Sequence, residues 1–240
     1  MRILVVSSCG KKKRIQPHKV PNCNDLTDNA SLSEWQSKLY HSVLPARDMY
    51  TGHQIRELVT GVDGLRAVRG IKVDLYIISA GFGILNENTL IPPYECSFNN
   101  MKKAAILERA EHLGIEEDFR DICGVNYDLL YIALSKKYMI AIGKQFLCGI
   151  DGTTLVFHKQ KMGPGAVYIP SGSAAVKRFS QQGFKIHGVV GFKGDLLRIL
   201  MAYAREKKNA YSELHSWKDP FKLRTIIYRL GRLEEEISDE

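Results

Sequence analysis

The chain has 240 residues, 45% of them hydrophobic, so it can bury a core without help from disulfides or metal ions. Its five cysteines show no CxxC or CxxH spacing, which indicates neither a disulfide framework nor a zinc site and favours the reducing cytoplasm. No stretch has the length of a signal sequence core or a membrane span. The net charge is +8 although five carboxylates lie in the terminal EEEISDE, so the remainder of the chain should attract polyanions such as nucleic acid.

The first hundred residues contain two apolar runs that predict buried strands, at 2–7 (RILVVS) and 73–79 (VDLYIIS). Between them, residues 10–27 are polar and hold two prolines, which predicts a loop. Helices are expected from about Ser31, where SLSE matches a capping box, and after Thr51.

The later part of the chain predicts further helices at 101–113 and 126–137, followed by a strand at 138–142 (YMIAI). The runs TTLVFH and AVYIP flank the loop KQKMGPG, which predicts a hairpin. Three more helices are expected in SGSAAVKRF, in GDLLRILMAYARE and from about Asp219 to Glu236.

These elements predict an α/β fold with a mixed central sheet flanked by helices, formed by residues 1–240 as one domain. In open α/β sheets, ligands bind where the loops at the carboxyl ends of strands splay apart. We therefore expect a ligand crevice at the C-terminal ends of the first strands.

A cysteine stands beside several lysines in the first candidate segment, SSCGKKK at 7–13. Nearby cations stabilise a thiolate, so Cys9 is a candidate nucleophile, and Lys12 could hold a phosphate or act as an amine nucleophile. Ser8 and Lys11 are assigned to substrate binding. Alternatively, Cys9 is a small packing residue and the lysines belong to a solvated loop.

The second candidate segment, PARDMYTG at 45–52, precedes an expected helix. A helix start presents free N–H groups to an anion, and Arg47 could add bidentate contacts. An Arg47–Asp48 pair that fastens the loop explains the same residues.

The third candidate segment, at 78–98, combines glycines with a rigid Pro-Pro-Tyr. Gly81 and Gly83 allow close approach of the backbone to a ligand, and Pro93 presents Tyr94 as a stacking platform for a base. A turn with a buried tyrosine is the alternative. The GFG sequence lacks the longer GxGxxG dinucleotide pattern.

Taken together, SCGKKK, ARDMYTG, IISAGFGIL and IPPY resemble the YaaA-like superfamily of peroxide-stress proteins over residues 3–98. The resemblance implies a compact α/β fold, DNA binding in at least one branch, and a site whose catalytic role is unproven. The residues that match that site are Cys9, Lys12, Arg47, Tyr50, Thr51, Gly52, Ser79, Gly81, Gly83, Pro93 and Tyr94.

The seven histidines show no i, i+4 pair typical of a helical metal site, so no metal and no cofactor is expected. The segment KQKMGPGAVYIPSGS could receive a phosphate at a serine-capped helix start, although a hairpin followed by a cap explains it equally. Basic residues of the last helix could touch a nucleic-acid backbone or simply cover a solvated face.

The leading hypothesis is a cytoplasmic enzyme that acts on a base or nucleoside in DNA, by N-glycosylase or base-modifying chemistry, with DNA favoured over RNA. Tyr50 and Tyr94 would stack on an extruded base, Arg47 would hold a phosphate, and Cys9 or Lys12 would act on the sugar or base. One alternative is a non-catalytic DNA-binding protein in stress protection or DNA repair. The other is an enzyme on a free nucleotide or sugar phosphate.

Overall fold

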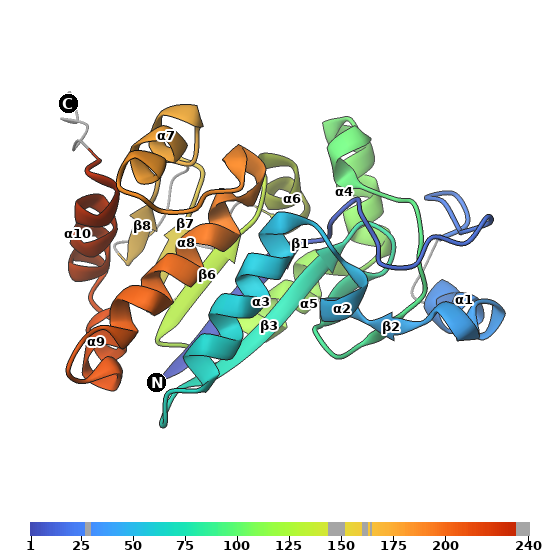
Figure 1. Cartoon of the computed structure of the whole chain (residues 1–240). Helices are drawn as coiled ribbons and strands as arrows, with labels where there is room; N and C mark the ends of the chain where they lie inside the picture. The colour runs from blue at the N-terminus through green and yellow to red at the C-terminus, as the bar shows by residue number, and fades with distance from the viewer. Residues whose placement is uncertain (27–29, 144–151, 160–162, 164, 234–240) are drawn as a thin grey trace.

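The computed structural model describes residues 1–26, 30–143, 152–159, 163 and 165–233 (Figure 1). Its strands are β1 (Arg2–Ser8), β2 (Leu44–Pro45), β3 (Lys72–Ser79), β4 (Gly83–Asn86), β5 (Leu90–Ile91), β6 (Leu129–Ala133), β7 (Thr153–Val156) and β8 (Ala166–Tyr168). Its α-helices are α1 (Ala30–Lys38), α2 (Ala46–Met49), α3 (His53–Arg66), α4 (Lys103–His112), α5 (Ile115–Cys123), α6 (Lys136–Ala141), α7 (Ser173–Gln181), α8 (Gly188–Arg205), α9 (Ala210–Ser216) and α10 (Pro220–Gly231). Two short 3-10 helices are η1 (Tyr40–Ser42) and η2 (Phe98–Asn100).

Six strands form one mixed sheet in the order β4-β3-β1-β6-β7-β8, which confirms the expected fold class. All neighbours are parallel except β3 and β4, which form an antiparallel pair around the GFG turn. In the centre of the sheet, Val5 lies opposite Leu75 on one side and Tyr131 on the other. The remaining strands, β2 and β5, form a separate small sheet.

Helices cover both faces of the sheet. Successive side chains of a strand point to opposite faces, so Ile3 and Val5 pack with α3 and α8, whereas Leu4 and Val6 pack with α4, α5 and α6. All four residues are essentially inaccessible to solvent. The continuous apolar sequence of β1 is thus explained by burial on both sides.

Helices α3 and α8 lie against each other at glycines, and Figure 1 shows them side by side in front of the sheet. A Cβ atom at Gly61 would lie 2.8 Å from Leu197 Cγ, and one at Gly64 would lie 2.7 Å from Met201 Cγ. At Gly194 it would lie only 2.2 Å from the backbone oxygen of Gln54. These glycines therefore set the short distance between the two helices.

Most expected helices are confirmed, but the assignments around residue 135 are wrong. Residues 129–133 form β6 rather than part of a helix, and 136–141 form α6 rather than a strand. Both segments are short apolar runs, which periodicity alone does not separate into strand and helix. The expected hairpin is also wrong, because β7 and β8 are parallel.

The order in which the chain adds strands to the sheet reverses between the parallel neighbours β1 and β6. From β1 the chain passes through α3 to β3 on one side, and β6 lies on the other side of β1 with α6 on the opposite face. Loops that leave neighbouring parallel strands in opposite directions define a topological switch point, where α/β proteins bind ligands. The carboxyl ends of β1 and β6 are thus the place to look for a site.

The glycine contact between α3 and α8 can be tested by adding a single methyl group. Gly194→Ala should lower the free energy of unfolding by about 2 kcal/mol or more, because the backbone of Gln54 cannot move aside. Gly172→Ala is the control, since a Cβ atom there meets nothing within 4 Å. Equal urea-unfolding midpoints for the two variants would contradict the close approach.

Candidate functional site

Cys9 lies directly after β1, at the carboxyl edge of the sheet. Its backbone N–H donates to the oxygen of Ile78 at 2.9 Å, which continues the pairing with β3. Its Sγ lies 3.0 Å from the hydroxyl of Tyr138, and only 7% of the residue is exposed. The switch point thus places a free thiol in a buried, polar environment.

A chain of hydroxyl groups continues from this thiol toward the end of β3. The hydroxyl of Tyr94 lies 2.8 Å from that of Tyr50 and 2.7 Å from Ser79 Oγ. Ser79 Oγ also accepts the N–H groups of Gly81 and Phe82, each at 3.0 Å. The hydrogen bonds of these buried hydroxyls are therefore supplied from within the protein.

Lys13 brings a cation into this network. The residue is 9% exposed, and its Nζ lies 4.2 Å from the ring centroid of Tyr94. Burial lowers the pKa of Lys13, while the nearby Cys9 acts in the opposite direction. We call this set the Cys9 cluster; its members are Cys9, Lys13, Tyr50, Ser79, Tyr94 and Tyr138.

The lysine at this site is Lys13 and not Lys12, which is a correction to the sequence prediction. Lys13 forms an antiparallel bridge with Tyr50, and side chains alternate along such an extended segment. Lys12, the next residue in this alternation, is exposed, and so is Lys11. Lys12 contributes its backbone oxygen, which accepts the N–H of Thr51 at 3.1 Å.

Arg47 is not available for a phosphate, because it is bound in an internal ion-pair network. Its guanidinium contacts both oxygens of Asp63, at 2.7 and 2.9 Å, and Glu87 Oε2 at 2.7 Å. Arg66 contacts the other oxygen of Glu87, which is buried. Arg47 thus fastens this segment, but its partners are Asp63 and Glu87 and not the expected Asp48.

The tyrosines do not offer a stacking platform either. Tyr50 and Tyr94 are 2% and 1% exposed, and Phe82 and Lys13 contact the Tyr94 ring. A Cβ atom at Gly81 would lie 2.8 Å from that ring, so Gly81 makes room for it. The rings are internal packing elements.

The remaining residues that were expected to contact a ligand are Gly83, Gly52, Pro93 and Thr51, and the structure shows where each lies. Gly83 adopts φ +72°, which the turn between β3 and β4 requires. Gly52 is the N-cap of α3, and Pro93 is buried. Thr51 is partly buried.

Gln54 spans the switch point, although no motif or spacing had indicated this residue. Its Nε2 lies 3.1 Å from Ser7 Oγ, 3.4 Å from Ser8 Oγ and 2.9 Å from the oxygen of Ala133. One side chain from α3 thus joins the carboxyl ends of β1 and β6. Ser8, which was expected at the site, is part of this contact.

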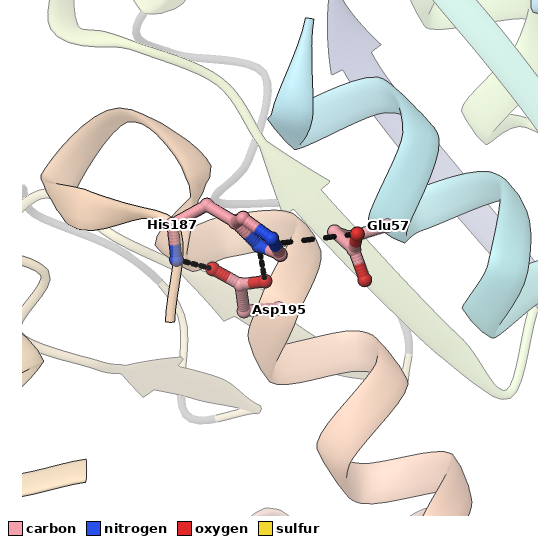
Figure 2. Close-up of side chains that lie close together, drawn as sticks. All are labelled: Glu57, His187 and Asp195. Atoms are coloured by element: carbon pink, nitrogen blue, oxygen red, sulfur yellow. Dashed lines mark hydrogen bonds and ion pairs between the residues drawn. The ribbon is translucent and has the colours of Figure 1, made fainter. Parts of the chain in front are cut away.

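A histidine and two carboxylates from α3 and α8 lie beside the start of α3 (Figure 2). Asp195 is fully buried and accepts both the backbone N–H of His187, at 2.8 Å, and a contact from His187 Nδ1 at 2.7 Å. Glu57 Oε1 lies 3.9 Å from the same nitrogen, and the ring of His53 stacks on His187 with centroids 4.4 Å apart. We call Glu57, His187 and Asp195 the His187 group.

The ligand atoms of the His187 group lie within 4.8 Å of one another, which is a geometry that could hold a metal ion. However, Arg198 already supplies positive charge there: its Nε lies 2.6 Å from Glu57 Oε2, and its Nη2 lies 3.5 Å from Asp195 Oδ1. Arg198 and the two carboxylates of the group therefore form ion pairs within the protein. Sequence spacing could not reveal it, because its members are separated by up to 138 positions.

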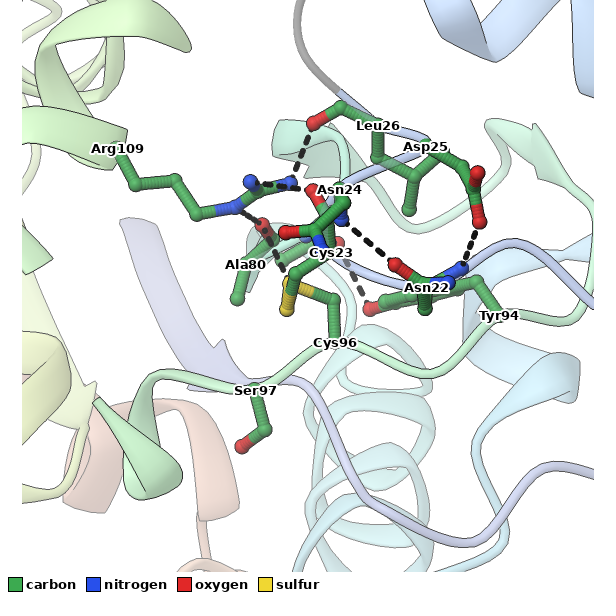
Figure 3. Close-up of a disulfide and its surroundings, with 12 residues drawn as sticks. Asn22, Cys23, Asn24, Asp25, Leu26, Ala80, Tyr94, Cys96, Ser97 and Arg109 are labelled. Carbon is green, nitrogen blue, oxygen red and sulfur yellow. Dashed lines mark hydrogen bonds between the residues drawn. A yellow bond between two sulfur atoms is a disulfide. The ribbon is translucent and has the colours of Figure 1, made fainter. Parts of the chain in front are cut away.

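A disulfide joins Cys23 to Cys96, contrary to the sequence expectation (Figure 3). The two cysteines are 73 positions apart, so local spacing carried no signal for the pair. Arg109 reinforces this cross-link, since its guanidinium donates to the backbone oxygens of Cys23, Leu26 and Ala80. Together they fasten the loop after Lys13 to the segment that carries Tyr94.

No protein-family model matches the chain, and no curated protein matches it. None of the helices in the described ranges has the length and apolar character that crossing a bilayer requires. The resemblance to the YaaA-like superfamily thus stays a prediction.

The disulfide should contribute substantially to stability. Closing a loop of 73 positions restricts the unfolded chain by about 4 kcal/mol in the chain-entropy model, so Cys23→Ser should lower the free energy of unfolding by an amount of this order. Urea unfolding without reductant measures the change, with Cys123→Ser, which removes a free thiol, as the control. Equal unfolding midpoints for Cys23→Ser and the unchanged protein would contradict the cross-link.

The buried tyrosines predict an alkaline transition. Burial raises the pKa of Tyr50, Tyr94 and Tyr138 in the folded state, whereas tyrosine in an unfolded chain ionises near pH 10. Their contribution to stability is therefore complete below about pH 10 and declines as the pH rises further. Near-ultraviolet absorbance should show these tyrosinates forming only as the protein unfolds.

Tyr138→Phe should reduce the amplitude of that late ionisation step. Tyr40→Phe is the control, because Tyr40 is 67% exposed and its loss should leave the late step unchanged. Ionisation of all tyrosines before unfolding would contradict the buried network.

Proposed function

We propose that the protein acts on a base or nucleoside in DNA through the Cys9 cluster. The resemblance to the YaaA-like superfamily contributes the expectation of DNA binding. The observation that carries the proposal is the position of Cys9, a free thiol beside a topological switch point and a buried lysine. The positive charge of the chain favours a polyanionic substrate. A cytoplasmic location is part of this proposal, although the Cys23–Cys96 disulfide removes the cysteine argument for it, because disulfides are rare in the reducing cytoplasm.

In this proposal, Cys9 and Lys13 are the reactive groups. A lysine with a lowered pKa is a candidate amine nucleophile, and Cys9 is the free thiol near it. Lys13 thus takes the role that the sequence assigned to Lys12. Either group would attack an electrophilic carbon of the sugar or base.

Access to the Cys9 cluster requires a movement of the loop that covers it. Cys9, Lys13 and both neighbouring tyrosines are each less than a tenth exposed, so a base cannot reach the thiol in the present arrangement. The loop at 10–26 has almost no regular structure, but the Cys23–Cys96 disulfide and Arg109 hold its far end. The mobile part in this proposal is therefore the stretch between Arg14, whose N–H donates to the oxygen of Met49, and Pro21, whose oxygen accepts the N–H of Glu95. Lys13 stays in place through its bridge to Tyr50.

The enclosed position of Cys9 favours a second candidate, an enzyme on a free nucleotide or sugar phosphate. A small ligand needs less displacement of the loop than an extruded base attached to DNA does. Stabilisation against heat by free nucleotides, together with indifference to DNA, would favour this candidate.

Binding and product formation can be measured together to test the leading proposal. Labelled single- and double-stranded DNA is titrated at two salt concentrations, and the recovered DNA is checked for abasic sites, strand breaks and altered bases. We expect binding that weakens with salt and product that disappears in Cys9→Ser and Lys13→Met. Binding without product in the unchanged protein would leave only DNA protection.

Matched variants separate chemistry from folding. Cys123→Ser removes the other free thiol of the described residues, and Lys12→Met removes the exposed neighbour of Lys13. Both should retain product formation, and all four variants should show a cooperative unfolding transition. Product formation that is unaffected by Cys9→Ser and by Lys13→Met would overturn the proposal.

A further inference from the structure

Lys193 is a buried lysine for which the described part of the chain supplies no counter-charge. It lies near the start of α8 and is 7% exposed, and it forms no hydrogen bond or ion pair through its side chain with the described residues. The hydroxyl of Tyr131 donates to its backbone oxygen at 2.6 Å, which holds this part of the helix against β6. Its Nζ lies 5.8 Å from the ring centroid of Phe157.

An unpaired ammonium in such a position opposes folding, because burial removes water without supplying an anion. Accordingly, burial lowers the pKa of Lys193, and no carboxylate raises it. By contrast, the buried Glu87 and Asp195 each contact cationic groups. The cost of keeping Lys193 uncompensated points to a partner that the described residues do not provide.

His158 presents a second unsatisfied group at the same place. Its Nε2 is inaccessible to solvent and has no hydrogen-bond partner among the described residues, while a hydrogen bond to the backbone of Leu134 orients the ring. Burial lowers the pKa of His158, and the charges of Lys193 and Lys136 lower it further. Three basic side chains are thus close enough to influence one another.

These groups lie at the carboxyl edge of the parallel sheet. Leu134 follows β6, and Phe157 and His158 follow β7. These are the next two strands along the edge from β1, which carries Cys9 at its end. Ser171 Oγ donates to the backbone oxygen of Phe157 at 3.5 Å, which places the start of α7 nearby.

The start of helix α7 adds backbone N–H donors near Lys193 and His158. Its N-cap is Gly172, which has no side chain to accept the N–H groups of the first turn. Free N–H groups at the start of a helix favour an anion, and phosphate is the anion they most often bind.

We infer that Lys193 and His158 bind a phosphate group, with the N-terminus of α7 and Lys136 beside it. The Lys193 ammonium supplies donors, and His158 Nε2 supplies another when the ring is protonated, a form that a bound phosphate anion favours. Phosphate has several oxygens that can accept from different directions. The phosphate belongs either to a free nucleotide or to a nucleic-acid backbone. The inference deepens the proposed function by naming a second contact to its substrate, but phosphate binding itself does not depend on Cys9.

Inorganic phosphate is the probe that tests the site directly, by isothermal calorimetry and thermal unfolding. We expect phosphate to raise the melting temperature of the unchanged protein, and Lys193→Met to weaken phosphate binding by roughly tenfold or more. Without phosphate, Lys193→Met should melt at a higher temperature than the unchanged protein, because it removes an unpaired buried charge. A merely structural lysine would give the opposite change.

Two further variants complete the experiment. His158→Asn should weaken phosphate binding, whereas Lys185→Met, which removes an exposed lysine just before α8, should leave it unchanged. Absence of phosphate binding by the unchanged protein, or equal binding by Lys193→Met, would overturn the inference.

Competition identifies the source of the phosphate. A deoxynucleoside monophosphate that displaces inorganic phosphate more effectively than an oligonucleotide indicates a free nucleotide, and the reverse order indicates the DNA backbone. Cys9→Ser should bind phosphate normally in either case. Phosphate binding without any DNA product would therefore refute only the proposed chemistry, while product formation without phosphate binding would refute only this site.

Discussion

The close approach of α3 and α8 is the constraint on which the arrangement of the sheet edge depends. Gly194 lies against the backbone of Gln54, so the starts of the two helices are held together. This contact brings His187 against His53 and leaves Gln54 directed at the ends of β1 and β6. It also places Lys193 above the end of β7. Because Gly194 has no Cβ atom, side chains of α3 and α8 can lie at the ends of the three strands β1, β6 and β7.

The sequence predicted strands correctly where both faces of the strand are buried. It failed where a short apolar run is compatible with either a strand or a helix. The β-branched runs of β1 and β3 were recognised, because both faces of these strands are covered. The segments that became β6 and α6 are equally apolar and short, and only the neighbouring β1 decides which of them enters the sheet. Periodicity describes one segment at a time, so it could not supply that information.

The same limit explains the candidate site. The three segments from the first hundred residues do meet, since Cys9, Tyr50 and Tyr94 belong to one cluster. Which lysine joins them depends on the bridge to Tyr50, which turns Lys13 inward. Arg47 forms ion pairs with Asp63 and Glu87, which only the folded chain brings close to it. The sequence motifs thus selected segments that lie together, but they did not identify the contacts that each side chain makes.

The two halves of the sheet edge differ in how completely their polar groups are satisfied. Around Cys9, the hydroxyls bond to one another and to backbone N–H groups, and the loop covers them. Around Lys193, an ammonium and an imidazole nitrogen lack partners among the described residues. A satisfied buried network resists opening, whereas unsatisfied groups gain free energy from a ligand. A phosphate-bearing ligand would consequently engage the Lys193 side first, and that binding could supply free energy for displacing the loop over Cys9.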